Sequence, residues 1–137
     1  MLEHRQELIS GPNIPIMELV HNDPRRTIRE AAITVPGSPL RRITEIVVKR
    51  PEAGQTMDLG NHYHEKPEDF VIVEGTPKVS TAHIDNPSQV VVKVMSAGDT
   101  ITMQPGVAHK FSFDGPGQLR STMEGTFEES GTQTYKL

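Results

Sequence analysis

The chain has 137 residues, a formal net charge of −4 and no cysteine. Its length favours one domain with a buried core, and the lack of cysteine excludes disulfides, zinc–thiolate sites and cysteine nucleophiles. Because the basic residues form no common face, a nucleic-acid partner is not expected. Neither a membrane-spanning run nor the apolar centre of a signal peptide is present, so we expect a cytoplasmic protein without membrane contact.

Short segments separated by turn-forming residues run along the chain. Eleven glycines and eleven prolines are spread through the sequence, which is typical of many short strands joined by turns. In chain order the expected strands are 14–20, 27–35, 43–49, 55–63, 69–74, 78–84, 89–95, 99–103, 108–114 and 118–124. The pattern predicts an all-β sandwich or barrel over 15–137, preceded by an N-terminal arm or edge strand over 1–14.

Three histidines and one glutamate have the spacing of a metal site. His62 and His64 are two residues apart, so in an extended strand both rings project from the same face. Pro67 interrupts the ladder after them, and a hairpin at this point would return Glu68 beside the two rings. His109 follows a Pro-Gly turn and arrives from elsewhere in the sheet.

A lone histidine in a β protein makes hydrogen bonds more commonly than it binds metal, and we assign that role to His4, His21 and His83. The four clustered residues differ, because ionisable groups that converge inside a barrel without an ion would leave costly unpaired polar atoms. We therefore predict that they bind a divalent transition metal. The ligand set suits Fe, Mn, Ni, Co, Cu or Zn and does not select among them.

The surrounding sequence resembles the two motifs of the cupin family. In the first motif the His-x-His pair, the glutamate and Gly75 stand in register, and in the second Gly98, Gly106 and His109 keep their spacing. The first motif's initial glycine is replaced by Thr56, the second motif's proline is displaced by one position, and Phe113 replaces its closing asparagine. The resemblance covers residues 54–113. It implies a single-domain double-stranded β-helix, or jelly-roll barrel, that binds metal and forms a homodimer.

Strand alternation also predicts the surroundings of the metal. Phe70 continues the inward face of the glutamate, and Phe111 and Phe113 share the parity of His109. Met103 is a further candidate for this wall. We therefore expect a substrate pocket lined by Phe70, Met103, Phe111 and Phe113, although the same side chains would serve as barrel core. The sequence identifies no catalytic acid or base.

Three functions stay open for such a barrel. The Gly-Asn-His-Tyr-His run at 60–64 resembles cupin domains of capsular-polysaccharide and nucleotide-sugar enzymes, which implies an isomerase or epimerase of keto sugars. An iron-dependent dioxygenase would use the same ligands with an apolar pocket, and a non-catalytic barrel would bind or sense a small molecule. Residues 11–17 are apolar, contain proline and suit pairing along an edge strand of a second copy, so we expect a homodimer.

Overall fold

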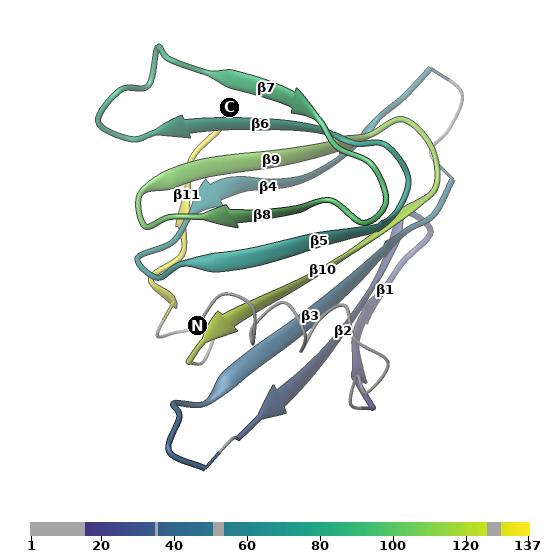
Figure 1. Ribbon diagram of the computed structural model, residues 1–137. Coiled ribbons are helices and arrows are strands. Elements are labelled where there is room, and N and C mark those ends of the chain that lie inside the picture. The colour runs from purple at the N-terminus through teal and green to yellow at the C-terminus, as the bar shows by residue number, and fades with distance from the viewer. Residues whose placement is uncertain (1–15, 35, 51–53, 126–129) are drawn as a thin grey trace.

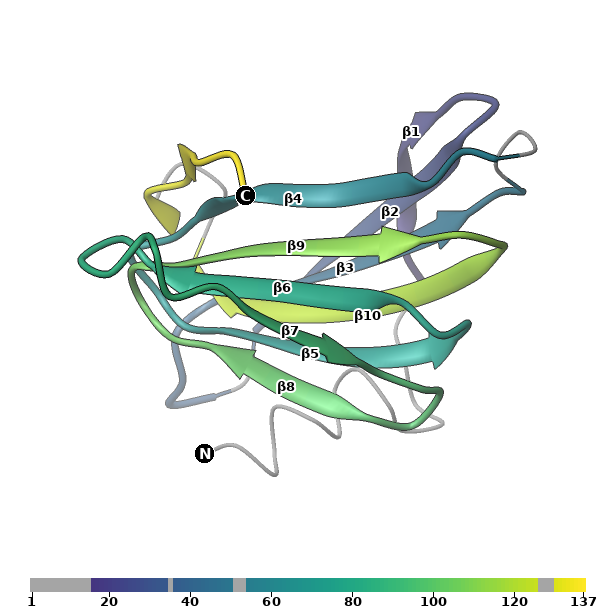
Figure 2. The same cartoon turned by 90° about the horizontal axis from the view of Figure 1, so that it is seen from above.

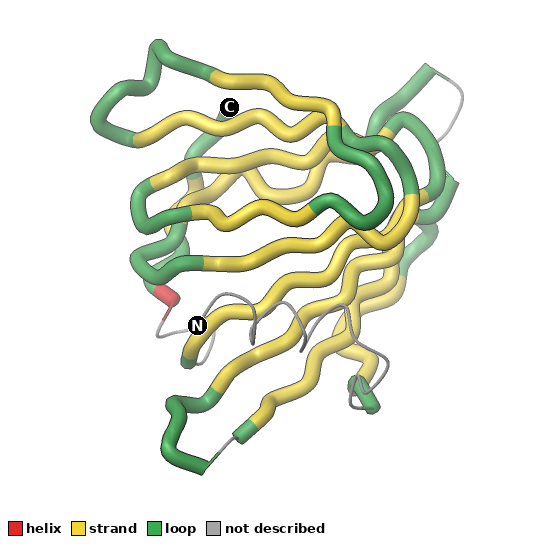
Figure 3. The backbone as a smooth tube through the Cα atoms, in the orientation of Figure 1, coloured by secondary structure: helices red, strands yellow, loops and turns green. Residues whose placement is uncertain are grey.

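The computed structural model describes residues 16–34, 36–50, 54–125 and 130–137, and strands joined by turns occupy nearly all of these ranges (Figures 1 and 3). The strands are β1 (Glu18–Asn22), β2 (Arg26–Ile33), β3 (Arg41–Val48), β4 (Met57–Tyr63), β5 (Glu68–Glu74), β6 (Lys78–His83), β7 (Val91–Val94), β8 (Thr100–Met103), β9 (Val107–Phe113), β10 (Gly117–Glu124) and β11 (Gln133–Thr134). Each expected strand is present with ends shifted by a few residues, and β11 is additional. The predicted arm over 1–14 and most of the dimer segment 11–17 lie outside the described residues.

Two antiparallel sheets face each other (Figure 2). One has the order β1-β2-β3-β10-β5-β8, and the other has the order β11-β4-β9-β6-β7. Strands far apart in the chain lie side by side, as β10 does between β3 and β5, which is the connectivity of a jelly roll. The predicted all-β jelly-roll domain is confirmed. Within the described ranges, no helix is both long enough and apolar enough to span a bilayer.

The main core fills the space between the sheets. Its members alternate along the strands because successive side chains point to opposite faces; they are Val48, Met57, Leu59, Phe70, Ile72, Val79, Met95, Met103, Phe111, Phe113 and Leu119. A smaller cluster around Ile43 and Val71 covers the outer face of the six-stranded sheet. Since β5 lies between the two clusters, it is buried on both faces from Glu68 to Ile72.

The predicted hairpin between His64 and Glu68 is wrong. β4 belongs to the five-stranded sheet and β5 to the six-stranded sheet, so the intervening chain crosses from one sheet to the other. Backbone groups here bond to other segments: Gly106 N–H donates to the His64 carbonyl at 3.0 Å, and Glu65 N–H donates to the Ser130 carbonyl at 2.8 Å. Glu68 therefore faces the histidines from the opposite layer.

Candidate metal centre

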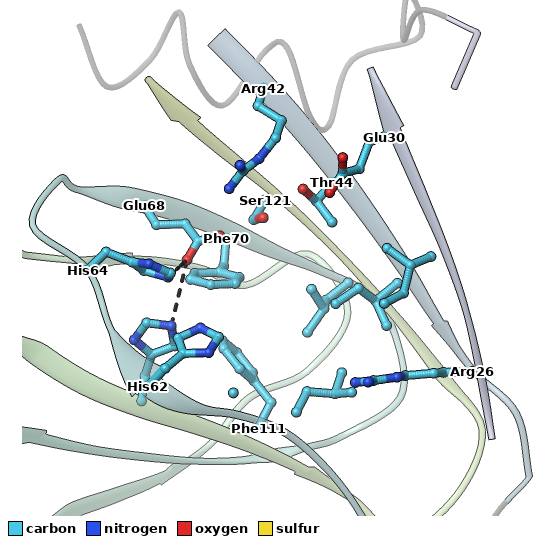
Figure 4. Close-up of a pocket in the computed structure, with 16 residues that line it drawn as sticks. Arg26, Glu30, Arg42, Thr44, His62, His64, Glu68, Phe70, Phe111 and Ser121 are labelled. Atoms are coloured by element: carbon cyan, nitrogen blue, oxygen red, sulfur yellow. Dashed lines mark ion pairs between the residues drawn. The ribbon is translucent and has the colours of Figure 1, made fainter. Parts of the chain in front are cut away.

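The four predicted ligands meet at one end of the space between the sheets. Each offers one ligand atom, and these atoms lie within 4.8 Å of one another. His62 pairs directly with His109 across β4 and β9, His64 follows the end of β4, and Glu68 opens β5 in the facing sheet (Figure 4). The exposed fractions of His64, Glu68 and His109 are 5%, 7% and 1%. The expected convergence of these residues is present.

A β-bulge in β4 turns both histidines inward. Leu59 faces the core opposite Phe111, yet His62, three residues later, also faces inward because the register shifts between Gly60 and His62. Asn61, with φ of 59°, occupies the extra position. Strict alternation from Leu59 would have pointed His62 outward, so the bulge is what makes the site possible.

The bulge requires glycine at position 60. The φ of Gly60 is 102°, a conformation that L side chains rarely adopt. A Cβ there would lie 2.5 Å from the carbonyl oxygen of His109. The backbone of β4 thus approaches the backbone of a ligand too closely for any side chain.

A second partner holds the His109 ring in a metal-binding tautomer, and another partner contacts the second ring nitrogen of His64. His109 Nδ1 lies 3.0 Å from the Val107 carbonyl oxygen, which only accepts, so Nδ1 carries the proton and Nε2 keeps its lone pair. His64 Nδ1 lies 2.7 Å from the Thr132 hydroxyl oxygen, which is 2.7 Å from the hydroxyl oxygen of buried Ser130. Metal-binding histidines commonly donate their second ring N–H in this way.

The chemistry of the cluster fits a cation. Glu68 Oε1 lies 2.9 Å from His64 Nε2 and 3.6 Å from His109 Nε2, but neither pair has hydrogen-bond geometry. All three atoms are buried without a hydrogen-bond partner in the part of the chain that the structure describes. Buried polar atoms are otherwise almost always satisfied. A divalent ion bound by these atoms would satisfy them together.

The ionisation of the cluster is also suited to metal binding. Burial alone would raise the pKa of Glu68, but the neighbouring imidazoles of His109 and His64 outweigh it and hold the pKa well below its usual range. Burial, assisted by repulsion from His109 and His64, lowers the pKa of His62 to about 4. At neutral pH the carboxylate is therefore charged and the His62 lone pair is available.

A cavity of about 370 Å³ adjoins the cluster, between β2 and β3 on one side and β4 and β9 on the other. Phe70 and Phe111, predicted as pocket residues, line it, and the Phe70 ring lies 5.5 Å from the His109 ring between centroids. Met103 and Phe113 instead pack in the main core and are not among its lining residues in the described chain. The cavity wall is therefore only partly the one that alternation indicated.

Sequence reasoning left several groups of the site unassigned. The hydroxyl of Thr132 had no signal, because its segment is not adjacent to any motif. The polar and charged groups of the remaining cavity wall come from β2, β3 and β10, and they are Arg26, Glu30, Arg42, Thr44 and Ser121 (Figure 4). The sequence shows that side chains alternate between the two faces of these strands, but it does not show which face lines the cavity.

Comparison with protein-family models and with curated proteins finds no match. Among solved structures, the chain is similar to the capsular polysaccharide assembling protein CapF from Staphylococcus aureus, with a TM-score of 0.71 and 17% identity over 93% of this chain and 34% of that one. It is also similar to oxalate decarboxylase from Bacillus subtilis, with a TM-score of 0.68 and 15% identity over 86% of this chain and 30% of that one. The oxalate decarboxylase of Lactobacillus farciminis, solved as a formate complex, gives a TM-score of 0.67 and 17% identity over 88% and 34%.

These likenesses show the fold, which is that of a single cupin-type jelly roll. The chain spans about a third of the length of the structures that it matches. At these identities the likenesses show the fold alone, and the candidate metal site rests on the clustered histidines and glutamate.

Proposed function

We propose that the chain is a metal-dependent enzyme that acts on a small oxygenated substrate. The observation that carries this proposal is the cluster of His62, His64, Glu68 and His109 at one end of a cavity of about 370 Å³. A bound divalent ion would supply Lewis-acid polarisation of a substrate carbonyl or hydroxyl oxygen. Closed structural sites have no need of such a cavity beside them.

The protein's own groups suit proton transfer next to a polarised oxygen. Glu30, on β2, is a carboxylate outside the cluster that lines the cavity, and Thr44 and Ser121 lie in the same row across β3 and β10. We assign Glu30 the role of proton acceptor and donor, and Thr44 and Ser121 the role of orienting the substrate through hydrogen bonds. Isomerisation or epimerisation of a keto sugar is the first candidate reaction, supported by the likeness to CapF.

Phe70 and Phe111 favour a second candidate, an iron-dependent dioxygenase. Their rings have centroids 4.7 Å apart, and both line the cavity beside the metal-binding residues. An apolar wall of this kind suits dioxygen. Consumption of dioxygen by the iron-reconstituted protein, measured with an oxygen electrode, supports this candidate, whereas solvent deuterium incorporation into a keto sugar without oxygen consumption supports the first.

Metal binding is tested directly. Protein purified without chelators is analysed for metal content, and apo-protein is titrated calorimetrically with Mn²⁺ and Zn²⁺. We expect one ion per chain, lost in Glu68→Gln and His109→Ala. His83→Ala, which removes an exposed histidine outside the cluster, is the matched control and should bind as the wild type does. A wild-type protein without stoichiometric metal would refute the proposal.

A further inference from the structure

Arg26 lies at the other end of the cavity, and the described residues supply no partner for its guanidinium. Its side chain lines the cavity and points into it (Figure 4). The Nε atom is buried and has no hydrogen-bond partner, and no ion pair of this side chain occurs in the described ranges. A buried donor without a partner costs roughly 1–3 kcal/mol, so an unoccupied cavity is unfavourable at this point.

Hydrogen bonds to Asp23 fix the position of the Arg26 main chain. The Asp23 carboxylate accepts the backbone N–H of Arg25 at 2.7 Å and of Arg26 at 2.9 Å. It also lies 2.7 Å from His21 and 3.6 Å from the Arg25 guanidinium. Asp23 therefore holds the start of β2 while its own charge is already occupied by other groups, which leaves the Arg26 side chain free to face the cavity.

Strand register separates Arg26 from the metal-binding cluster. Glu68 shares a row with Met123, Arg42 and Ala32 across four strands, and Arg26 lies six residues before Ala32 on β2. Six residues of strand span roughly 20 Å. The cavity thus has a cluster for a cation at one end and a fixed cation at the other.

Beyond the row of Glu30, Thr44 and Ser121, apolar side chains line the stretch that leads to Arg26. Ile28, Ile46, Leu59, Phe111 and Leu119 all contribute to the cavity wall. A volume of about 370 Å³ is near the lower end of the range for small-molecule sites, and spread along this length it favours a slender, unbranched ligand. A matching ligand has an oxygen donor at one end, a carbon body in the middle and an anion at the other end.

Building on the proposed function, we propose that the substrate is a small oxo or hydroxy acid whose distal carboxylate binds Arg26 while its oxygen donors face the metal-binding residues. A guanidinium presents Nε–H and an adjacent N–H side by side, which matches the two oxygens of a carboxylate. Arg26 is the single cationic side chain at this end among the described lining residues. One positive charge balances a carboxylate and not a phosphate dianion.

Calorimetry on the full chain loaded with redox-inert Zn²⁺ tests this assignment. The probes are 2-oxo dicarboxylic acids of increasing chain length, the same acids with the distal carboxylate converted to an amide, and acids that end in phosphate. For the best-fitting length we expect the dicarboxylic acid to bind about 10- to 100-fold more tightly than its amide, which is the usual size of a hydrogen bond to a charged group.

The variants decide whether Arg26 is responsible. Arg26→Gln should abolish the preference for the dicarboxylic acid, and Arg26→Lys should keep part of it because the charge remains without the paired donors. Arg29→Gln is the matched control, since Arg29 lies on the same strand but pairs with Glu45 on the opposite face. It should leave the preference unchanged.

Each remaining outcome has one meaning. If Zn²⁺ itself does not bind, both the proposed function and this inference fail. If Zn²⁺ and the amide bind but the dicarboxylic acid binds no more tightly than its amide, this inference alone is overturned. It is also overturned if Arg26→Gln keeps the preference for the dicarboxylic acid. The same holds if no acid of the series binds the Zn²⁺-loaded protein, or if the phosphate-ended acid binds more tightly than the carboxylate-ended one.

Discussion

The two ends of the cavity are built in different ways. At the metal-binding end, each of two ligand rings is held by a second partner, and the close approach of Gly60 to His109 sets the backbone. At the arginine end, Arg26 has a fixed backbone but a side chain with no partner among the described residues. The comparison indicates that the first end is organised before any ligand arrives, whereas the second is completed by the ligand.

Gly60→Ala should break the metal-binding end most severely. A Cβ 2.5 Å from the His109 carbonyl oxygen, together with a φ of 102°, forces β4 away from β9. We expect a loss of about 3–4 kcal/mol in the free energy of unfolding, measured by urea denaturation of the apo-protein, and loss of metal binding by calorimetry.

Gly98→Ala separates the clash from the backbone strain. Gly98 has a similar φ of 92°, but a Cβ there would contact nothing within 4 Å. This variant should lose only about 1 kcal/mol and should bind metal normally. Equal destabilisation by the two substitutions would show that the close approach to His109 is unimportant.

The same contrast explains which parts of the site the sequence could predict. Histidine and glutamate stand in a recognisable spacing in the sequence, so the members of the cluster were predictable although the hairpin was not. The path of Glu68 into the facing sheet depends on long-range backbone bonds to Gly106 and Ser130, which leave no local pattern. The same is true of Arg26, since an arginine at the start of a strand is ordinary until strand register places it in a cavity.

Thr132→Val tests whether the second partners organise the metal-binding end. The substitution keeps the shape of the side chain but removes the hydroxyl that lies 2.7 Å from His64 Nδ1. We expect metal affinity to fall about 10- to 100-fold, measured by calorimetry, with the fold retained by circular dichroism. Thr134→Val, an exposed position in β11, is the control. Unchanged affinity in the Thr132 variant would mean that the His64 ring is held by packing alone.

The pH dependence of the apo-protein reports on His62. Its pKa falls from 6.5 to about 4 on folding, so between these values the unfolded chain binds a proton that the folded chain does not. Stability should therefore decrease as the pH falls from 7 to 5, by about 1–2 kcal/mol after allowance for partial exposure. The pKa of Glu68 is also lowered on folding, so Glu68 adds its own loss of stability only when the pH falls below the ordinary pKa of 4.5.

Two variants isolate this contribution in denaturation curves recorded at both pH values. His62→Gln should show a smaller decrease in stability between pH 7 and pH 5, because the titrating imidazole is gone. His83→Gln, at an exposed site, should behave as the wild type does. An undiminished decrease in the His62 variant would assign the effect to other groups.

Substitution of Arg26 should not destabilise the ligand-free protein, in contrast to substitution of Gly60 at the metal-binding end. Arg26→Met removes a buried Nε–H that has no partner in the described chain and leaves an apolar side chain in a cavity that Ile28 and Leu119 also line. We expect the free energy of unfolding to stay the same or to rise by up to about 1 kcal/mol, measured by urea denaturation of the apo-protein. A loss above about 1 kcal/mol would show that Arg26 supports the fold, and the two ends of the cavity would then be organised alike.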